Sequence, residues 1–363
     1  MTVTQRSSLL ARTISTPIIL IAILIAIALL AKFVGSGPFS RTIVEMFIRV
    51  MLVAGLYIFV GNSGVISFGH IGFMCIGAYA AAWFTIPPAM KGVTLQGLPS
   101  FLAHAQLPFL VSTALAGLLA AIFALIVGRI MMRLAGIAAS IATFAMLAVI
   151  NVVYSNWDSV TGGTGSIVGI PFYTGIWTAL GGAILVIIIA YLYQISRSGL
   201  ALRAGRDEAT AAAASGIDIV RERHIAFVIS AFTIGVAGAI YGHFLGVVNP
   251  DAFYLGVTFI TLSMLVVGGM NSLSGAVIGV IVISTIIQLL RWLEKGIDLG
   301  GATLSIPNGL QEITIGLVMI VILMFRPQGL TRNREIVWRF WPVKQGGAAM
   351  EPVLRNDHAQ ARN

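Results

Sequence analysis

The chain has 363 residues, of which 58% are hydrophobic and only 10% are charged. Because soluble domains carry about 25% charged residues, this composition excludes an ordinary soluble domain. It indicates an all-α polytopic membrane protein. The net charge of +9 comes from short loops and tails rather than from one binding module, so no nucleic-acid partner is expected.

Apolar windows predict about ten transmembrane helices, since crossing a hydrocarbon core of ~30 Å takes about 20 residues. In chain order they are residues 13–31, 42–60, 64–86, 107–128, 134–154, 175–195, 225–248, two helices within 252–290, and 306–325. The longest window divides at the turn-rich run 268–275. The first window follows two arginines, as in a secretory signal, but it is too long for one and no cleavage pattern follows it. We therefore expect it to be retained as a span.

The positions of the basic residues predict that both termini are cytoplasmic. With ten spans and the amino end inside, most of the 22 lysines and arginines fall in inner loops and tails. Inner loops of membrane proteins carry this excess of positive charge. The sequence then divides into a transmembrane domain, residues 1–330, and a basic cytoplasmic tail, residues 331–363. A charged loop at residues 196–224 lies on the same side as the tail.

The charged loop stands between two strongly apolar spans and holds five arginines and four acids. Its alanine-rich part predicts a surface helix over residues 202–215, ended by Gly216. The alanine face, with Ala212, would fit a groove of a soluble partner. Four charged side chains would set the orientation of that partner: Arg203, Arg206, Asp207 and Glu208. A solvated interhelical loop with no partner is the simpler alternative.

Polar residues within predicted spans are candidates for a transport pathway, since placing them in lipid costs free energy. The glycine-rich run at residues 61–70 is expected to interrupt a helix and to expose backbone groups toward a cavity. Four side chains are the pathway candidates: Asn62, Ser67, His70 and Asn151. A structural histidine is the competing interpretation for His70. For Asn151 and the loop at 161–165, the alternative to an outer gate or a docking surface is an ordinary solvated turn.

A ridge of small residues follows the span at 225–248, at Gly238, Gly242 and Gly246. Glycines spaced four apart let helices approach closely, so static packing is the simplest interpretation. The functional alternative is that these smooth surfaces slide during alternating access.

The sequence holds no pattern for catalysis, for a metal site or for a cofactor of its own. None of the four lysines completes a phosphate-binding GxxxxGK[ST] motif, so this chain cannot hydrolyse ATP by that route. The histidines are scattered, and no zinc-ligand spacing occurs. Glu45 and Arg49 lie four residues apart within a span, and we interpret them as a structural pair that neutralises itself.

Several motifs occur along the chain: SRSGLALRAGRDEA at the start of the charged loop with the span that follows it, NP at 249–250, GG at 268–269, FRPQGL at 325–330, SFGH at 67–70 and TGGTG at 161–165. Together they resemble the M-type permease subunit of bacterial branched-chain amino-acid ABC importers. Their order and spacing extend over most of residues 55–330.

This resemblance implies a permease subunit in a bacterial inner membrane, surrounded by membrane lipid, that transports leucine, isoleucine and valine. A periplasmic solute-binding protein would deliver the solute, two P-loop ATPase subunits would use the ATP, and a second homologous permease subunit, identical or different, would complete the pathway. The charged loop would couple to the ATPases through the residues named above, Ala212 and Gly216 included.

Two alternatives stay open. Related permeases handle urea, short amides or aromatic acids. A stand-alone secondary transporter or channel would need acids or cation sites within its spans, and Glu45 and Glu312, both near span ends, are the only such acids.

Overall fold

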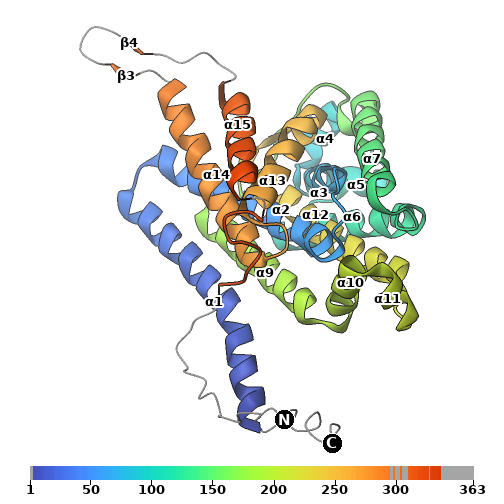
Figure 1. Ribbon diagram of the computed structural model, residues 1–363. Helices are drawn as coiled ribbons and strands as arrows, with labels where there is room; N and C mark the ends of the chain where they lie inside the picture. The colour runs from blue at the N-terminus through green and yellow to red at the C-terminus, as the bar shows by residue number, and fades with distance from the viewer. Residues whose placement is uncertain (1–2, 295–296, 299–302, 305–309, 327, 337–363) are drawn as a thin grey trace, which may run out of the picture.

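The computed structural model describes residues 3–294, 297–298, 303–304, 310–326 and 328–336, which are almost entirely helical (Figure 1). Eight helical segments among them are long and apolar enough to cross a membrane. Their helices are α1 (Val3–Val34), α2 (Gly37–Ser63), α6 (Phe109–Met131), α7 (Gly136–Asn156), α9 (Ile176–Ile195), α12 (Ile219–Leu245), α13 (Leu255–Gly268) with the preceding 3-10 turn η1 (Pro250–Phe253), and α14 (Leu273–Glu294). The all-α polytopic class is therefore confirmed.

Two further apolar helices have 16 residues each: α3 (His70–Thr85) and α15 (Leu310–Phe325). Both lie within predicted spans. α3 begins later than predicted because the glycine-rich run interrupts the helix, with Gly64 ending α2 at a φ of +71°. The count of ten spans and the cytoplasmic position of the termini stay predictions.

The centre of the bundle is formed by α2 and α12, the most buried of the long helices. α12 packs against α3, α6 and α2, and α2 also packs against α9. Glycines allow these contacts: a Cβ atom added to Gly77 of α3 would lie 2.0 Å from the carbonyl oxygen of Gly235 in α12. By contrast, only 28% of the apolar window of α1 or α7 is buried, which leaves surfaces suited to lipid.

The short elements between these helices are α4 (Pro88–Thr94), α5 (Ser100–His104), α8 (Asp158–Thr161), β1 (Ile167–Val168), β2 (Val247–Val248), β3 (Ile297–Asp298) and β4 (Thr303–Leu304). β1 pairs antiparallel with β2, and β3 with β4. The connection through α4 and α5 is fixed by Lys91, which is buried and donates hydrogen bonds to the carbonyls of Leu102 and Ala105. Burial lowers the pKa of this ammonium, and the two carbonyls offset part of the cost of burying its charge.

The charged loop forms two short helices, so the single helix predicted over 202–215 is wrong. They are α10 (Arg197–Asp207) and α11 (Ala209–Ala214), separated by Glu208 in an extended conformation. α10 begins early because the Ser196 hydroxyl caps it by accepting a hydrogen bond from the Gly199 amide. α10 packs against α2 and α12. Gly216 follows α11 with a φ of +83°, the conformation in which glycine ends a helix, as predicted.

Candidate functional sites

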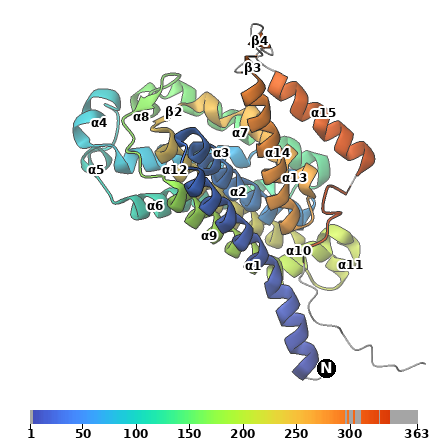
Figure 2. The ribbon, with the colours of Figure 1, turned by 90° about the vertical axis from the view of Figure 1, so that its left-hand side faces the viewer.

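The charged loop lies at the end of the bundle where α2 and α9 finish and α14 begins. Figures 1 and 2 show α10 and α11 there, on the side from which α1 enters, while the β3–β4 hairpin lies at the far end. We call this the loop end of the bundle. It brings together three segments that are distant in sequence: the charged loop, the break between α13 and α14, and residues 328–336.

Arg206 anchors the charged loop to the end of α2. Its guanidinium donates a hydrogen bond of 2.7 Å to the Gly61 carbonyl oxygen and also pairs with Asp207 at 2.9 Å. The last carbonyls of a helix lack intrahelical partners and carry the negative end of the helix dipole, so a cation is stabilising there. Arg203 acts in the same way at the end of α9, where it donates to the Gln194 carbonyl.

The six predicted coupling residues therefore divide into two groups. Arg203, Arg206 and Ala212 are directed toward this chain's own helices, and the Arg206 side chain is only 20% exposed. Asp207, Glu208 and Gly216 are exposed, and the Asp207 side chain is 69% exposed. The arginines fix the loop to the bundle, which leaves α11 and the two acids as the free surface. A coupling role for either group stays a prediction.

Glu335 connects the start of the predicted tail to two helices. One carboxylate oxygen accepts hydrogen bonds from the Leu273 amide at 2.8 Å and the Gln194 side chain at 3.0 Å. The other accepts from the Ser274 amide at 3.0 Å and the Ser274 hydroxyl at 2.6 Å. The first amides of α14 have no acceptor within the helix, so this carboxylate supplies one. Its negative charge also stabilises the positive end of the helix dipole. No local pattern in the sequence indicates this contact, because the partners lie 61 to 141 residues from Glu335 along the chain.

Asn62, Ser67 and His70 are all buried, where α2 ends and α3 begins. The Nδ1 atom of His70 lies 2.6 Å from the Ser67 hydroxyl, and the imidazole packs against Phe59 and Phe227 with ring centroids 5.3 Å apart in each case. The Asn62 amide donates to the Ile58 carbonyl at 3.0 Å within α2. These contacts favour the structural interpretation of His70, and the pathway role of the three residues stays a prediction.

Asn151 lies on α7 and donates a hydrogen bond of 3.3 Å to the Pro250 carbonyl in η1. It thereby connects two elements that flank α3. The Thr161 hydroxyl, in the predicted gate loop, donates to the Tyr154 carbonyl and holds that turn against the end of α7. Both hydrogen bonds fix the position of a backbone segment, and neither shows whether these segments form a gate.

The three ridge glycines have different surroundings. A Cβ atom on Gly238 would lie 2.1 Å from the Met74 carbonyl oxygen of α3, whereas one on Gly242 would find its nearest neighbour at 3.6 Å. Gly246 lies beyond the end of α12 with a φ of +72°, so it caps the helix rather than continuing the ridge. Of these three glycines, only Gly238 lies where two helices approach closely.

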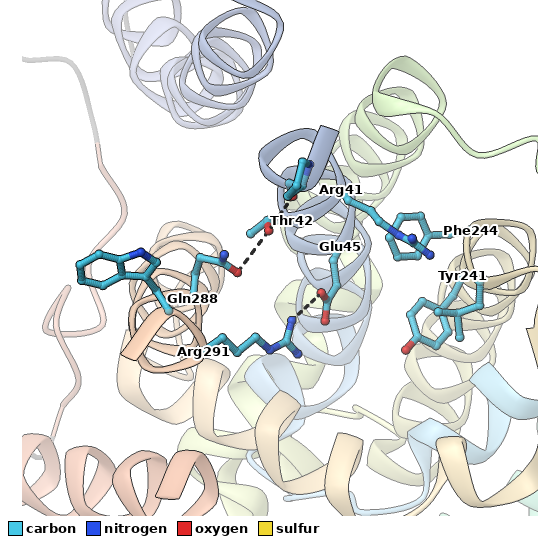
Figure 3. Close-up of a pocket in the computed structure, with 10 residues that line it drawn as sticks. Arg41, Thr42, Glu45, Tyr241, Phe244, Gln288 and Arg291 are labelled. Atoms are coloured by element: carbon cyan, nitrogen blue, oxygen red, sulfur yellow. Dashed lines mark hydrogen bonds and ion pairs between the residues drawn. The ribbon is translucent and has the colours of Figure 1, made fainter. Parts of the chain in front are cut away.

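An open cavity of about 440 Å³ lies at the opposite end of α2, α12 and α14 (Figure 3). We call it the Glu45 pocket. Its lining residues are Pro38, Arg41, Thr42 and Glu45 from α2, Tyr241, Phe244 and Leu245 from α12, and Gln288, Arg291 and Trp292 from α14.

Three charged residues line the Glu45 pocket: Arg41, Glu45 and Arg291. The Glu45 carboxylate pairs with Arg291 at 3.1 Å and with Arg49. Arg41 lies over the Phe244 ring, 5.6 Å from its centroid. The interpretation of Glu45 and Arg49 as a pair that neutralises itself is therefore incomplete, because Arg291 of α14 shares the carboxylate. The sequence signal was present in the spacing of Arg41, Glu45 and Arg49, which puts all three on one face of a helix.

Comparison with known proteins gives one family and several relatives. The sequence profile described as "Branched-chain amino acid transport system / permease component" matches residues 39–323. The high-affinity branched-chain amino acid transport system permease protein LivM of Escherichia coli (strain K12) is 25% identical over 352 residues, covering 88% of this chain and 75% of LivM. The permease protein LivH of the same strain is 29% identical over 162 residues, covering 44% of this chain and 47% of LivH. No solved structure gives a significant match.

Proposed function

Because this chain belongs to the family of branched-chain amino acid transport system permease components, we propose that it is the membrane subunit of an ABC importer for leucine, isoleucine and valine. The importer would lie in a bacterial inner membrane, take its solute from a periplasmic binding protein, and be driven by two P-loop ATPase subunits. This chain would bind no cofactor of its own, and its partners would use the ATP. The multi-pass helical fold supports this assignment.

A second, homologous permease subunit would complete the pathway. Two different permease proteins of Escherichia coli, named LivM and LivH, both match this chain, LivM over most of it and LivH over less than half. This pattern supports pairing with a related but different subunit rather than with an identical copy.

At the molecular level, the proposal rests on how the charged loop is attached to the helix bundle. Arg206 and Arg203 tie it to the ends of α2 and α9, while α11 presents mostly small, exposed side chains outward. A displacement applied to α11 by a soluble ATPase would therefore reach α2 and α12 through α10. Such a rigid link suits coupling better than a free solvated loop does.

The substrate is tested by reconstituting the chain with the ATPases, a homologous permease and the binding protein in liposomes. We expect ATP-dependent uptake of radiolabelled leucine, isoleucine and valine. Urea, acetamide and benzoate serve as the comparison panel at the same concentration. ATP-dependent uptake of a panel compound, with none of the branched-chain amino acids, would overturn the substrate assignment while leaving the importer class intact.

A further inference from the structure

The Glu45 pocket carries more positive charge than its own acid can balance. The guanidinium groups of Arg41 and Arg291 line the pocket together with the Glu45 carboxylate, and Arg49 pairs with that carboxylate from the same helix. Arg41 forms no ion pair within the described part of the chain, and its guanidinium lies over the Phe244 ring. The Arg41 side chain is exposed, so its charge is available to an anionic group that enters the pocket. The pocket therefore offers a cation without an ion-pair partner beside the Glu45 and Arg291 pair.

The cavity beside the Glu45 pocket is apolar. It has a volume of about 360 Å³ and lies between α2 and α14, where its apolar lining residues are Phe39, Ile43, Met46, Leu289 and Trp292. Thr42 and Gln288 line both cavities, and the Thr42 hydroxyl donates to the Gln288 amide oxygen at 3.2 Å. A charged compartment thus adjoins an apolar one. Both volumes fall in the range of small-molecule sites, about 300–1,000 Å³.

We propose that the Glu45 pocket binds the zwitterionic head of an aliphatic α-amino acid. Arg41 and Arg291 receive the carboxylate, Glu45 receives the ammonium, and the aliphatic side chain enters the apolar cavity. The side chains in Figure 3 converge from α2, α12 and α14 on one space, as such a head group requires. The inference rests on the proposed function for the identity of the solute, and it makes this pocket the entry site at the outer face.

The pairing of charges explains why a zwitterion suits the pocket. A zwitterion placed between Glu45 and Arg291 replaces their direct contact with two new ion pairs, so neither group loses a partner. A carboxylic acid without an amine would bind the arginines but draw Arg291 away from Glu45, which would keep only Arg49. An amide would leave Arg41 unpaired. The site therefore discriminates because every incomplete ligand forms fewer ion pairs with Arg41, Arg291 and Glu45 than a zwitterion does.

Binding is tested on the purified chain in lipid nanodiscs by thermal shift. The probes are leucine, leucinamide, which lacks the carboxylate, and 4-methylpentanoate, which lacks the amine. The variants are Arg41→Gln and Glu45→Gln, with Lys32→Gln as the control because Lys32 is an exposed cation near the same end of the bundle but outside the pocket. Elution volume and unfolding temperature without ligand check that each variant folds.

Of the three probes, we expect only leucine to stabilise the wild type and the Lys32 variant. Arg41→Gln should weaken leucine binding about tenfold to a hundredfold, the range for losing a charged hydrogen bond. An equal response of the Arg41 variant and the wild type, or no response to leucine in either, would overturn the proposal. Stabilisation by phosphatidylethanolamine over phosphatidylcholine, lost in the Arg41 variant and insensitive to leucine, would assign the pocket to a lipid head group instead.

Uptake by the reconstituted importer separates this proposal from the function on which it rests. Leucine uptake that is unchanged by Arg41→Gln would refute the pocket and leave the importer standing. Leucine binding that depends on Arg41, in an assembly that transports no branched-chain amino acid, would support the pocket and refute the proposed importer function.

Discussion

Replacing Arg206 tests whether the charged loop is rigidly joined to the bundle. The Arg206→Gln variant removes the 2.7 Å hydrogen bond to the Gly61 carbonyl and the ion pair with Asp207. The first is a charged hydrogen bond from a largely buried side chain, worth about 1.5–3 kcal/mol. The second involves a mostly exposed carboxylate and contributes less than about 1 kcal/mol. Together they correspond to about 2 kcal/mol, or roughly a 30-fold change in the ratio of docked to undocked loop.

The assay for Arg206→Gln is the number of leucine molecules imported per ATP hydrolysed in proteoliposomes. We expect the ATPases to remain bound and active while the transport ratio falls severalfold, because movement of α11 no longer reaches α2. Hydrogen exchange across α10 should rise in parallel. Arg221→Gln is the matched control, since Arg221 is an exposed arginine of the same loop. If the transport ratio and the exchange rates of the Arg206 variant equal those of the control, the rigid link is refuted.

Three further variants examine the packing that supports the sites. Glu335→Ala removes the cap of α14 and should lower the free energy of unfolding by about 1–2 kcal/mol, seen as a lower unfolding temperature; an unchanged temperature would mean that the cap is dispensable. Gly238→Ala should destabilise the protein by about 1–3 kcal/mol through overpacking, while Gly242→Ala, where there is room for a methyl group, should be tolerated; equal unfolding temperatures for the two would contradict the packing described. Ser67→Ala should cost about 1 kcal/mol of stability through the lost contact with His70 yet leave the apparent leucine affinity intact, and a changed affinity would return His70 to the pathway.

Features governed by local sequence were predictable. Hydrophobic windows located the long helices, because lipid demands an unbroken apolar stretch wherever a chain crosses it. Glycine marked the interruption at Gly64 and the end of the helix before Gly216, since both positions have positive φ. The family resemblance rested on the same local motifs, and the family match over residues 39–323 confirms it.

Features that depend on distant partners were not predictable. Arg291 lies 246 residues from Glu45, and nothing in either sequence neighbourhood indicates that they meet. Glu335 belongs to a stretch that composition assigns to a polar tail, yet it caps α14. The arginines of the charged loop look available to a partner by composition, whereas the structure directs Arg203 and Arg206 to helix ends of the same chain. Side-chain direction is a tertiary property that charge patterning does not determine.

The energy source of transport tests the central claim most directly. Leucine uptake is measured in proteoliposomes that contain this chain, a homologous permease and the binding protein, with and without the ATPase subunits, at fixed ion gradients. An ABC importer predicts uptake only when the ATPases and ATP are both present, and no response when the proton or sodium gradient is collapsed. Uptake that persists without the ATPases and disappears with an ion gradient would identify a secondary transporter and contradict the account.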